Sequence, residues 1–185
     1  MRRRFFRRVG RPLQRIHVNG ISPLLLRSNQ LLSAGEFVGA ADGFEELAKE
    51  AEGRGHPRAA QLYLEAGRAR ILSGETTAGM VLINQGLRLI AASGRPLRLA
   101  RAGQRILGEL SARGLAGEAA ELRDALSALG GSSAHLSHQE LPAQPQRTLP
   151  IHCPDCGAPV HPDEVEWLNA STAECPYCGT PMRAE

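Results

Sequence analysis

The last 35 residues of the chain contain all four of its cysteines, in two copies of the pattern Cys-Pro-x-Cys-Gly-x-Pro. Two cysteines three positions apart on a tight turn can reach adjacent corners of a tetrahedron, and the glycine after them supplies the positive φ that reverses the turn. Eighteen residues separate the two pairs, which is within the range of a four-thiolate zinc site. The pattern therefore predicts four ligands of one structural zinc ion: Cys153, Cys156, Cys175 and Cys178.

The region 151–185 resembles the zinc ribbon family through these two turns. The resemblance implies that the four cysteines are the zinc ligands and that the module is small and β-rich. Val160 and the alternation Val165-x-Trp167 suggest the short strands. A module of this size cannot bury enough apolar surface by itself, so we expect zinc removal to unfold it and to leave the helices intact.

Other interpretations of the cysteines are weaker. The second pair also matches the glutaredoxin motif Cys-Pro-Tyr-Cys, but only seven residues follow Cys178, too few for the long helix which that fold needs. A disulfide is disfavoured because we expect the chain to lie in the cytosol, where thiols stay reduced. His152 or His161 could replace a thiolate, although four cysteines already complete the shell. A catalytic zinc is disfavoured because four thiolates leave no open position for water.

The region 22–130 is predicted to be helical. Alanine, leucine, glutamate and arginine dominate it, and β-branched residues are few. Ser22-Pro23 is typical of a helix start, and recurring glycines are typical of helix ends. The predicted helices are 23–33, 36–52, 57–73, 75–92, 96–113 and 115–129.

These helices form pairs with a repeating pattern. The turn glycines Gly35, Gly74 and Gly114 are 39 and 40 residues apart. A small residue follows five positions later in each unit, which predicts close packing of the two helices in a hairpin; the three small residues are Ala40, Gly79 and Ala119. A bulky residue four positions further on fills the gap between hairpins in the first two units, but the third has an arginine there; the residues are Phe44, Ile83 and Arg123.

The pattern resembles the tetratricopeptide repeat over residues 24–130, although the period is nearer 40 than 34 and the usual tryptophan is missing. A generic alanine-rich helical bundle is the alternative. We therefore predict a mainly α fold, a helix-hairpin (tetratricopeptide-like) array with a small β zinc-ribbon module. The predicted divisions are a basic arm (1–21), a helical repeat domain (22–130), a flexible linker (131–150) and the zinc ribbon (151–185).

Charge is distributed unevenly along the chain. Residues 1–30 carry eight arginines and no acid, whereas residues 151–185 carry six acids and one arginine. The basic arm could bind nucleic acid or an anionic membrane surface, or it could be a tail that aids solubility. Its arginines include Arg2, Arg3, Arg4, Arg7 and Arg8. The acidic ribbon should repel phosphate backbones, which argues against nucleic-acid binding there.

Arg98, Arg101 and Arg105 follow one face of a predicted helix. In tetratricopeptide-like arrays the first helix of each pair lines a concave groove, so the resemblance implies a groove for an acidic peptide or a C-terminal carboxylate. The acidic ribbon could dock there instead, or the arginines could simply pair with nearby glutamates at the surface.

The sequence favours a non-enzymatic protein-interaction adaptor. No nucleophile–base motif or phosphate-binding glycine loop is present, so no small-molecule substrate is expected. The absence of a secretory signal and of a membrane-length apolar stretch predicts a cytoplasmic protein. We expect the ribbon to contact a protein partner around Trp167, Leu168 and Tyr177, although a core role for Trp167 is favoured. The alternatives are a nucleic-acid-associated regulator and a peripheral membrane protein, both acting through the arm.

Overall fold

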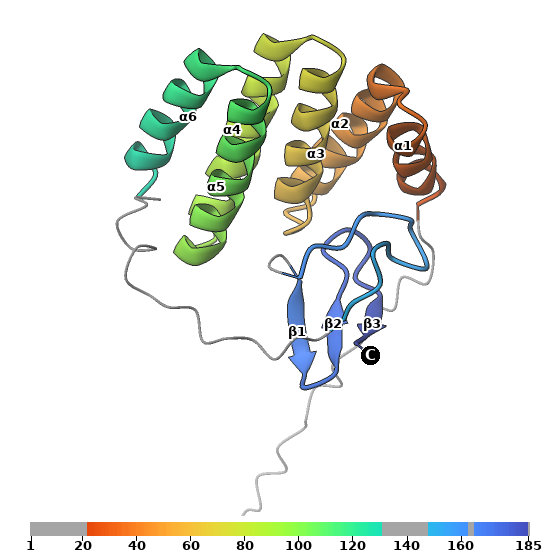
Figure 1. Cartoon of the computed structure of the whole chain (residues 1–185). Helices are drawn as coiled ribbons and strands as arrows, with labels where there is room; N and C mark the ends of the chain where they lie inside the picture. Colours follow the sequence, from red (N-terminus) through yellow and green to blue (C-terminus); the bar gives the residue numbers. More distant parts are fainter. Residues whose placement is uncertain (1–21, 131–147, 163–164, 185) are drawn as a thin grey trace, which may run out of the picture.

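A computed structural model describes residues 22–130, 148–162 and 165–184, and these residues form six helices and three strands (Figure 1). The predicted arm lies outside the described residues, as does the linker before residue 148. The helices are α1 (Pro23–Ser33), α2 (Phe37–Gly53), α3 (Ala59–Leu72), α4 (Thr76–Ala92), α5 (Pro96–Ala112) and α6 (Ala116–Ala128). All six predicted helices are confirmed, and their ends differ from the predicted ones by at most two residues.

The repeated glycines make the same turn in the three hairpins. After α3, Gly74 has a φ of +90°, and the Glu75 amide donates a 2.9 Å hydrogen bond back to the carbonyl of Arg70. Equivalent bonds join Glu36 to Leu31 and Leu115 to Leu110. Each bond satisfies a carbonyl that the end of a helix leaves open, so the repeat in the sequence marks a repeat of hairpin turns.

The predicted close packing of a hairpin is confirmed in the second one. A Cβ atom built on Gly67 in α3 would lie 2.7 Å from the Gly79 carbonyl oxygen in α4, and a Cβ on Gly79 would lie 2.7 Å from the Gly67 oxygen. Only two glycines allow the backbones to approach so closely. Ile83, four residues after Gly79, is fully buried, whereas Arg123 at the corresponding place in α6 is exposed.

The three strands form one antiparallel sheet in the order β1-β2-β3: β1 (Glu166–Asn169), β2 (Thr172–Glu174) and β3 (Pro181–Arg183). The predicted strand at Trp167 is confirmed, but the one at Val160 is wrong. The structure has an isolated bridge between His152 and Pro159, and the Val160 amide donates to the Ile151 carbonyl. These hydrogen bonds close the tight turn of the first cysteine pair, so Val160 does not belong to a strand.

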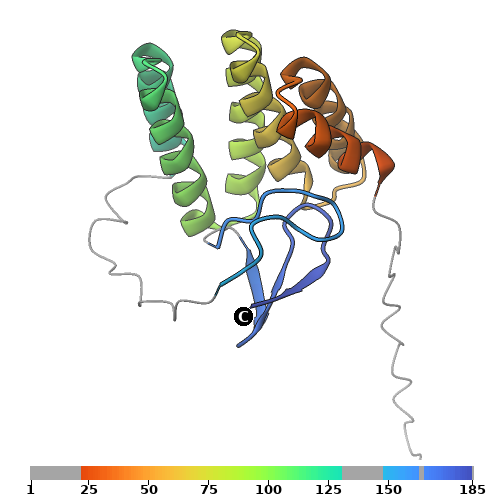
Figure 2. The same cartoon turned by 45° about the vertical axis from the view of Figure 1, so that its right-hand side comes forward.

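Two hydrophobic cores organise the described part of the chain. One contains residues of α3, α4, α5 and α6, among them the buried Leu64, Ile83 and Leu122. The other joins α1, α2 and α3 to the C-terminal module, with Phe44 and Met182 both buried in it. The module therefore packs against the helices, as two views agree (Figures 1 and 2). Leu149, from the predicted linker, is buried in this same core.

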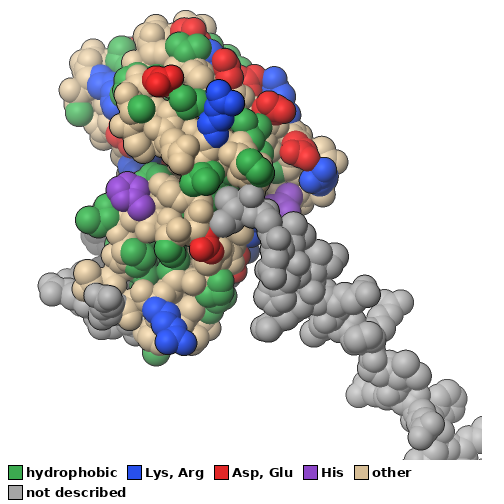
Figure 3. Space-filling view, turned by 90° about the vertical axis from the view of Figure 1, so that its right-hand side faces the viewer, with side chains coloured by type: hydrophobic (Ala, Val, Ile, Leu, Met, Phe, Trp, Pro, Cys, Tyr) green, Lys and Arg blue, Asp and Glu red, His purple; other side chains and the backbone are tan. Residues whose placement is uncertain are grey.

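Acidic and basic side chains are interspersed over the helices on one face of the molecule (Figure 3). No helix within the described ranges combines the length and the apolar character that crossing a bilayer requires.

Candidate metal centre

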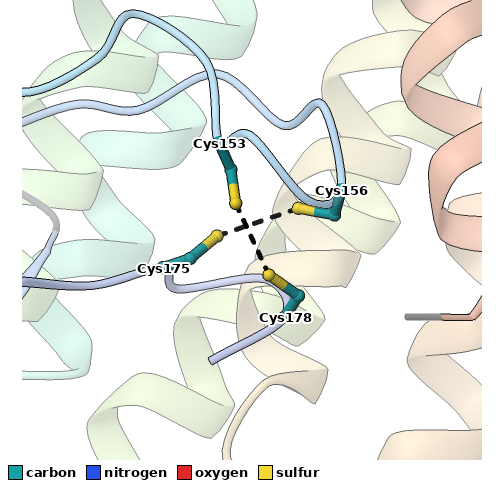
Figure 4. Close-up of side chains that lie close together, drawn as sticks. All are labelled: Cys153, Cys156, Cys175 and Cys178. Atoms are coloured by element: carbon teal, nitrogen blue, oxygen red, sulfur yellow. Dashed lines mark hydrogen bonds between the residues drawn. The ribbon is translucent and has the colours of Figure 1, made fainter. Parts of the chain in front are cut away.

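The four cysteines converge on one point (Figure 4). All four sulfurs lie within 4.8 Å of one another, and the Sγ atoms of Cys153 and Cys178 are 3.6 Å apart. Those of Cys156 and Cys175 are 3.8 Å apart. A tetrahedral ion with metal–sulfur bonds of about 2.3 Å has sulfur–sulfur edges of about 3.8 Å. The predicted ligands therefore lie at distances that suit one metal ion.

The two turns that carry the cysteines have the same hydrogen bonds. In the first, the Cys153 amide donates to the Ala158 carbonyl and the Gly157 amide donates to the Cys153 carbonyl. In the second, the Cys175 amide donates to Thr180 and the Gly179 amide donates to Cys175. The glycines have φ values of +70° and +76°, so each copy of the sequence pattern folds into the same ligand-bearing turn.

The local electrostatics favour a cation among the sulfurs. Hydrogen bonds from Cys156 and Cys175 lower the pKa of the Cys178 thiol, and Thr180 Oγ1, 3.2 Å from that sulfur, can donate to it. The pKa of the Cys156 thiol is raised, first by its hydrogen bonds to Cys175 and Cys178 and then by burial. Sulfurs this close cannot all be thiolates unless a cation neutralises them, so metal binding would release protons.

Other roles for the cysteines fit the structure less well. All four are free, and their sulfurs are much further apart than the roughly 2.05 Å of a disulfide. The residues after Cys178 form strand β3, where a glutaredoxin-like site requires a helix. Among the described residues, the cluster that could hold a metal contains the four cysteines and neither His152 nor His161. The donors therefore form a closed shell of four soft ligands.

The module that carries the cluster is anchored to the first helices of two hairpins. From α1, the side-chain amide of Asn29 donates a 3.0 Å hydrogen bond to the Cys156 carbonyl. From α3, the amide of Gln61 donates a 3.3 Å bond to the Tyr177 hydroxyl. Each contact involves a cysteine turn, so the metal cluster and the helical face are directly joined.

Tyr177 is buried, with 2% of its surface exposed, and belongs to the core shared with α1 and α2. The sequence-based expectation that it faces a separate partner is therefore wrong. Its hydroxyl also hydrogen-bonds Glu65, a carboxylate that is 1% exposed on α3. The sequence held one sign of this contact. Gln61 and Glu65 stand four residues apart on a helix that is otherwise alanine- and leucine-rich, and buried polar residues need partners.

Glu65 is held in its charged form by the surrounding arginines. Burial by itself raises the pKa of Glu65, but the charges of Arg68 and Arg105 oppose this effect. Hydrogen bonds from Tyr177 and Arg68 act in the same direction as those charges, and the resulting pKa is lowered. Arg68 contacts Glu65 at 2.9 Å and Glu109 of α5 at 2.8 Å. This network, with the buried Glu65 at its centre, links the module, α3 and α5.

The predicted arginine face of α5 divides into two parts. Arg98 and Arg101 line a cavity of about 630 Å³ between the helices and the module, together with Glu174 of β2. Arg105 has buried guanidinium nitrogens, and its charge acts on Glu65 inside the protein. The predicted site residues of the arm, Arg2, Arg3, Arg4, Arg7 and Arg8, lie outside the described residues.

No family model matches this chain, and no curated protein or solved structure matches it.

Proposed function

We propose that this chain is a non-enzymatic protein-interaction adaptor in which a tetratricopeptide-like array of helix hairpins carries a structural zinc ribbon. One observation carries the proposal: α1 and α3 hold another segment of polypeptide through a backbone carbonyl, that of Cys156, and a buried aromatic anchor, Tyr177. Anchors of this kind dominate the affinity of protein–protein interfaces. The face formed by the first helices is thus suited to bind polypeptide, and the ribbon occupies part of it.

Zinc is the proposed ion because four thiolates in a tetrahedral, closed arrangement are the donor set of structural zinc sites. Its role would be to fix the two turns, and through them the position of Tyr177. Elemental analysis of the purified full chain should find about one zinc per chain, and cobalt substitution should give the absorption of a tetrahedral thiolate site. Iron at that stoichiometry, or thiols that alkylate freely in the native protein, would refute the assignment.

The surface proposed for the partner is the exposed apolar part of the ribbon. Ile151 is 79% exposed and Leu168 is 52% exposed, although both are large hydrophobic residues. Leu168 was also expected from the sequence to contact a partner. Exposed aliphatic side chains of this size are natural contact points for another protein, since their burial contributes roughly 1.5–3 kcal/mol each.

The adaptor proposal can be tested by affinity purification from the native host. The baits are the full chain, a double variant Ile151→Glu/Leu168→Glu, and a matched control with two exposed helical positions changed, Arg88→Glu/Arg123→Glu. A partner that the wild type and the control capture and the ribbon variant loses supports the proposal. Capture of the same proteins by all three baits would contradict this surface. Nucleic acid in place of protein, lost on deletion of residues 2–15, would replace the adaptor with a nucleic-acid-associated protein.

A further inference from the structure

The four cysteines of the metal cluster differ in how far they are covered. Cys153, Cys156 and Cys175 are buried, with at most 2% of their surface exposed, whereas Cys178 is partly exposed. A thiol reacts with a dissolved reagent only when it is in the thiolate form and accessible, and metal ligation supplies the thiolate form. Of the four proposed ligands, Cys178 is therefore the one best placed to meet a reagent from solvent.

Cys178 also lines a cavity of about 540 Å³ between the ribbon and the helices. The helical wall includes Leu47 and Ala51 of α2 and Leu62 of α3, and the ribbon contributes residues of both cysteine turns. A cavity needs only about 10–15 Å³ to hold a water molecule. A neutral molecule little larger than water, such as hydrogen peroxide, therefore has room to approach this cysteine.

A second sulfur lies within reach of Cys178. Its Sγ atom is 3.6 Å from that of Cys153, and the sulfurs of Cys156 and Cys175 are 3.8 Å apart. Both of these contacts join one cysteine turn to the other (Figure 4). A disulfide bond is about 2.05 Å long, so a small movement of one turn is enough to close a bond across the first pair.

We propose that Cys178 is an oxidation site, at which hydrogen peroxide oxidises the metal-bound thiolate, Cys153 completes a disulfide and the zinc is released. The inference rests on the zinc site proposed above, and it adds a modification of one ligand.

The chemistry takes place in two steps at sulfur. The Cys178 thiolate attacks one peroxide oxygen, so an S–O bond forms, the O–O bond breaks and hydroxide leaves. The Cys153 thiolate then attacks the sulfur of the resulting sulfenic acid, so an S–S bond forms, the S–O bond breaks and a second hydroxide leaves. Two thiolates lose two electrons, and one peroxide gains them. The zinc loses two of its four ligands and departs.

Oxidation should change how the ribbon is docked, because Tyr177 directly precedes Cys178. Movement of the Cys178 sulfur toward Cys153 pulls on the turn that carries Tyr177, and zinc loss removes the ion that fixes both turns. The contacts of Tyr177 with Gln61 and Glu65 should therefore weaken. Peroxide loosens the ribbon from the helices in this scheme, and reduction in the presence of zinc restores it.

The test uses the zinc-loaded full chain, with zinc measured by elemental analysis before any oxidant is added. Hydrogen peroxide should release zinc to a chromogenic chelator at a rate proportional to the peroxide concentration. Dimedone should trap a sulfenic acid at Cys178, and peptide mapping without dimedone should find a disulfide between Cys153 and Cys178. Dithiothreitol with added zinc should restore the hydrogen-exchange protection of the ribbon. A chain that contains no zinc at the start refutes the zinc assignment itself, so that failure is separate from the outcomes below.

A matched pair of variants tests the route through the cavity. Glu50→Trp places a large side chain at an exposed position of α2 that lines the cavity. Glu46→Trp makes the same change one helical turn earlier, at an exposed position away from the cavity lining. Glu50→Trp should slow zinc release severalfold, because access controls the reactivity of a thiolate, and Glu46→Trp should react as the wild type does.

Four outcomes would overturn the proposal in whole or in part. Zinc that stays bound for hours in millimolar peroxide would remove the oxidation site. Dimedone on another of the four cysteines ahead of Cys178 would overturn the choice of residue. A disulfide within one turn would overturn the pairing with Cys153. Equal rates of zinc release in Glu50→Trp and Glu46→Trp would overturn the route through the cavity.

Discussion

The two cysteine turns have the same backbone structure and different relations to the helices. Both share one sequence pattern, one set of hydrogen bonds and a glycine with positive φ. They differ at the residue just before the second cysteine and in their helix contacts. Asp155 is exposed, whereas Tyr177 is buried and bonded to Gln61 and Glu65. The comparison teaches that the repeated residues make the ligand-bearing turn, and that the residue before the second cysteine decides how that turn is docked.

The first turn is docked through its backbone. Asn29 donates to the Cys156 carbonyl, and Gly157 lies near Leu26 and Asn29. A contact with a carbonyl does not depend on the side chain at position 155, so that position is free to carry a charge in solvent. The second turn depends on the side chain of Tyr177, whereas both turns need their glycine for its positive φ.

Metal removal should have the largest effect because it breaks both turns together. Structural zinc contributes about 10–16 kcal/mol in small peptide modules. Chelation should abolish hydrogen-exchange protection in residues 151–184. It should also lower protection in α1 and α2, which share the core of the ribbon, more than in α6, which belongs to the other core. Unchanged protection of the ribbon after verified metal loss would contradict this prediction.

The position before the second cysteine, Asp155 in one turn and Tyr177 in the other, gives the sharpest test of how the two turns differ. Tyr177→Ala should lower the free energy of unfolding by about 3–5 kcal/mol, because it removes a large buried side chain and leaves Gln61 and Glu65 without that partner. Asp155→Ala, at the equivalent and exposed place in the first turn, should change it by less than about 0.5 kcal/mol. Urea unfolding of the zinc-loaded variants measures both values. Similar costs at the two positions would show that the turns are docked alike.

The carboxylate of Glu65, which hydrogen-bonds Tyr177, should make the stability of the protein depend on pH. Glu65→Gln should cost about 3 kcal/mol at pH 7, because it leaves Arg68 and Arg105 without the buried carboxylate. The folded-state pKa of Glu65 is lowered from its usual 4.5, so its stabilisation is present at neutral pH and is lost as the pH falls through that folded-state value. The difference between wild type and variant should therefore shrink in acid. If the stability difference between wild type and Glu65→Gln stays constant from pH 7 into strong acid, the charge of Glu65 is not its cause.

The smallest effect is expected at the backbone contact of the first turn. Asn29→Ala removes one buried hydrogen bond to the Cys156 carbonyl and should cost about 2 kcal/mol, since the buried carbonyl loses this donor. Hydrogen exchange should show the first turn opening more often while the second keeps its protection. Equal loosening of both turns would mean that they open as one unit.

Much of the molecule could be predicted from local patterns. The helices end at glycines because a residue with positive φ is needed there, as at Gly74, and the paired turns form because each cysteine pattern contains its own bonding partners. Val160 was wrongly placed in a strand because an apolar residue beside a turn resembles one at a strand edge. Tyr177 was wrongly expected to face a separate partner because an aromatic between two metal ligands gives no local sign of what covers it.

The sequence alone determined the six helices, their hairpin turns and the four converging thiols, because each depends on interactions between residues close together in the chain or on one short repeated pattern. The tertiary structure decided that Tyr177 meets Glu65 and that arginines from two helices and one ribbon carboxylate share a cavity. Those contacts join residues far apart in the chain or lie between packed elements. Their energy depends on burial and on opposite charge at close range, and neither quantity exists until the elements have packed together.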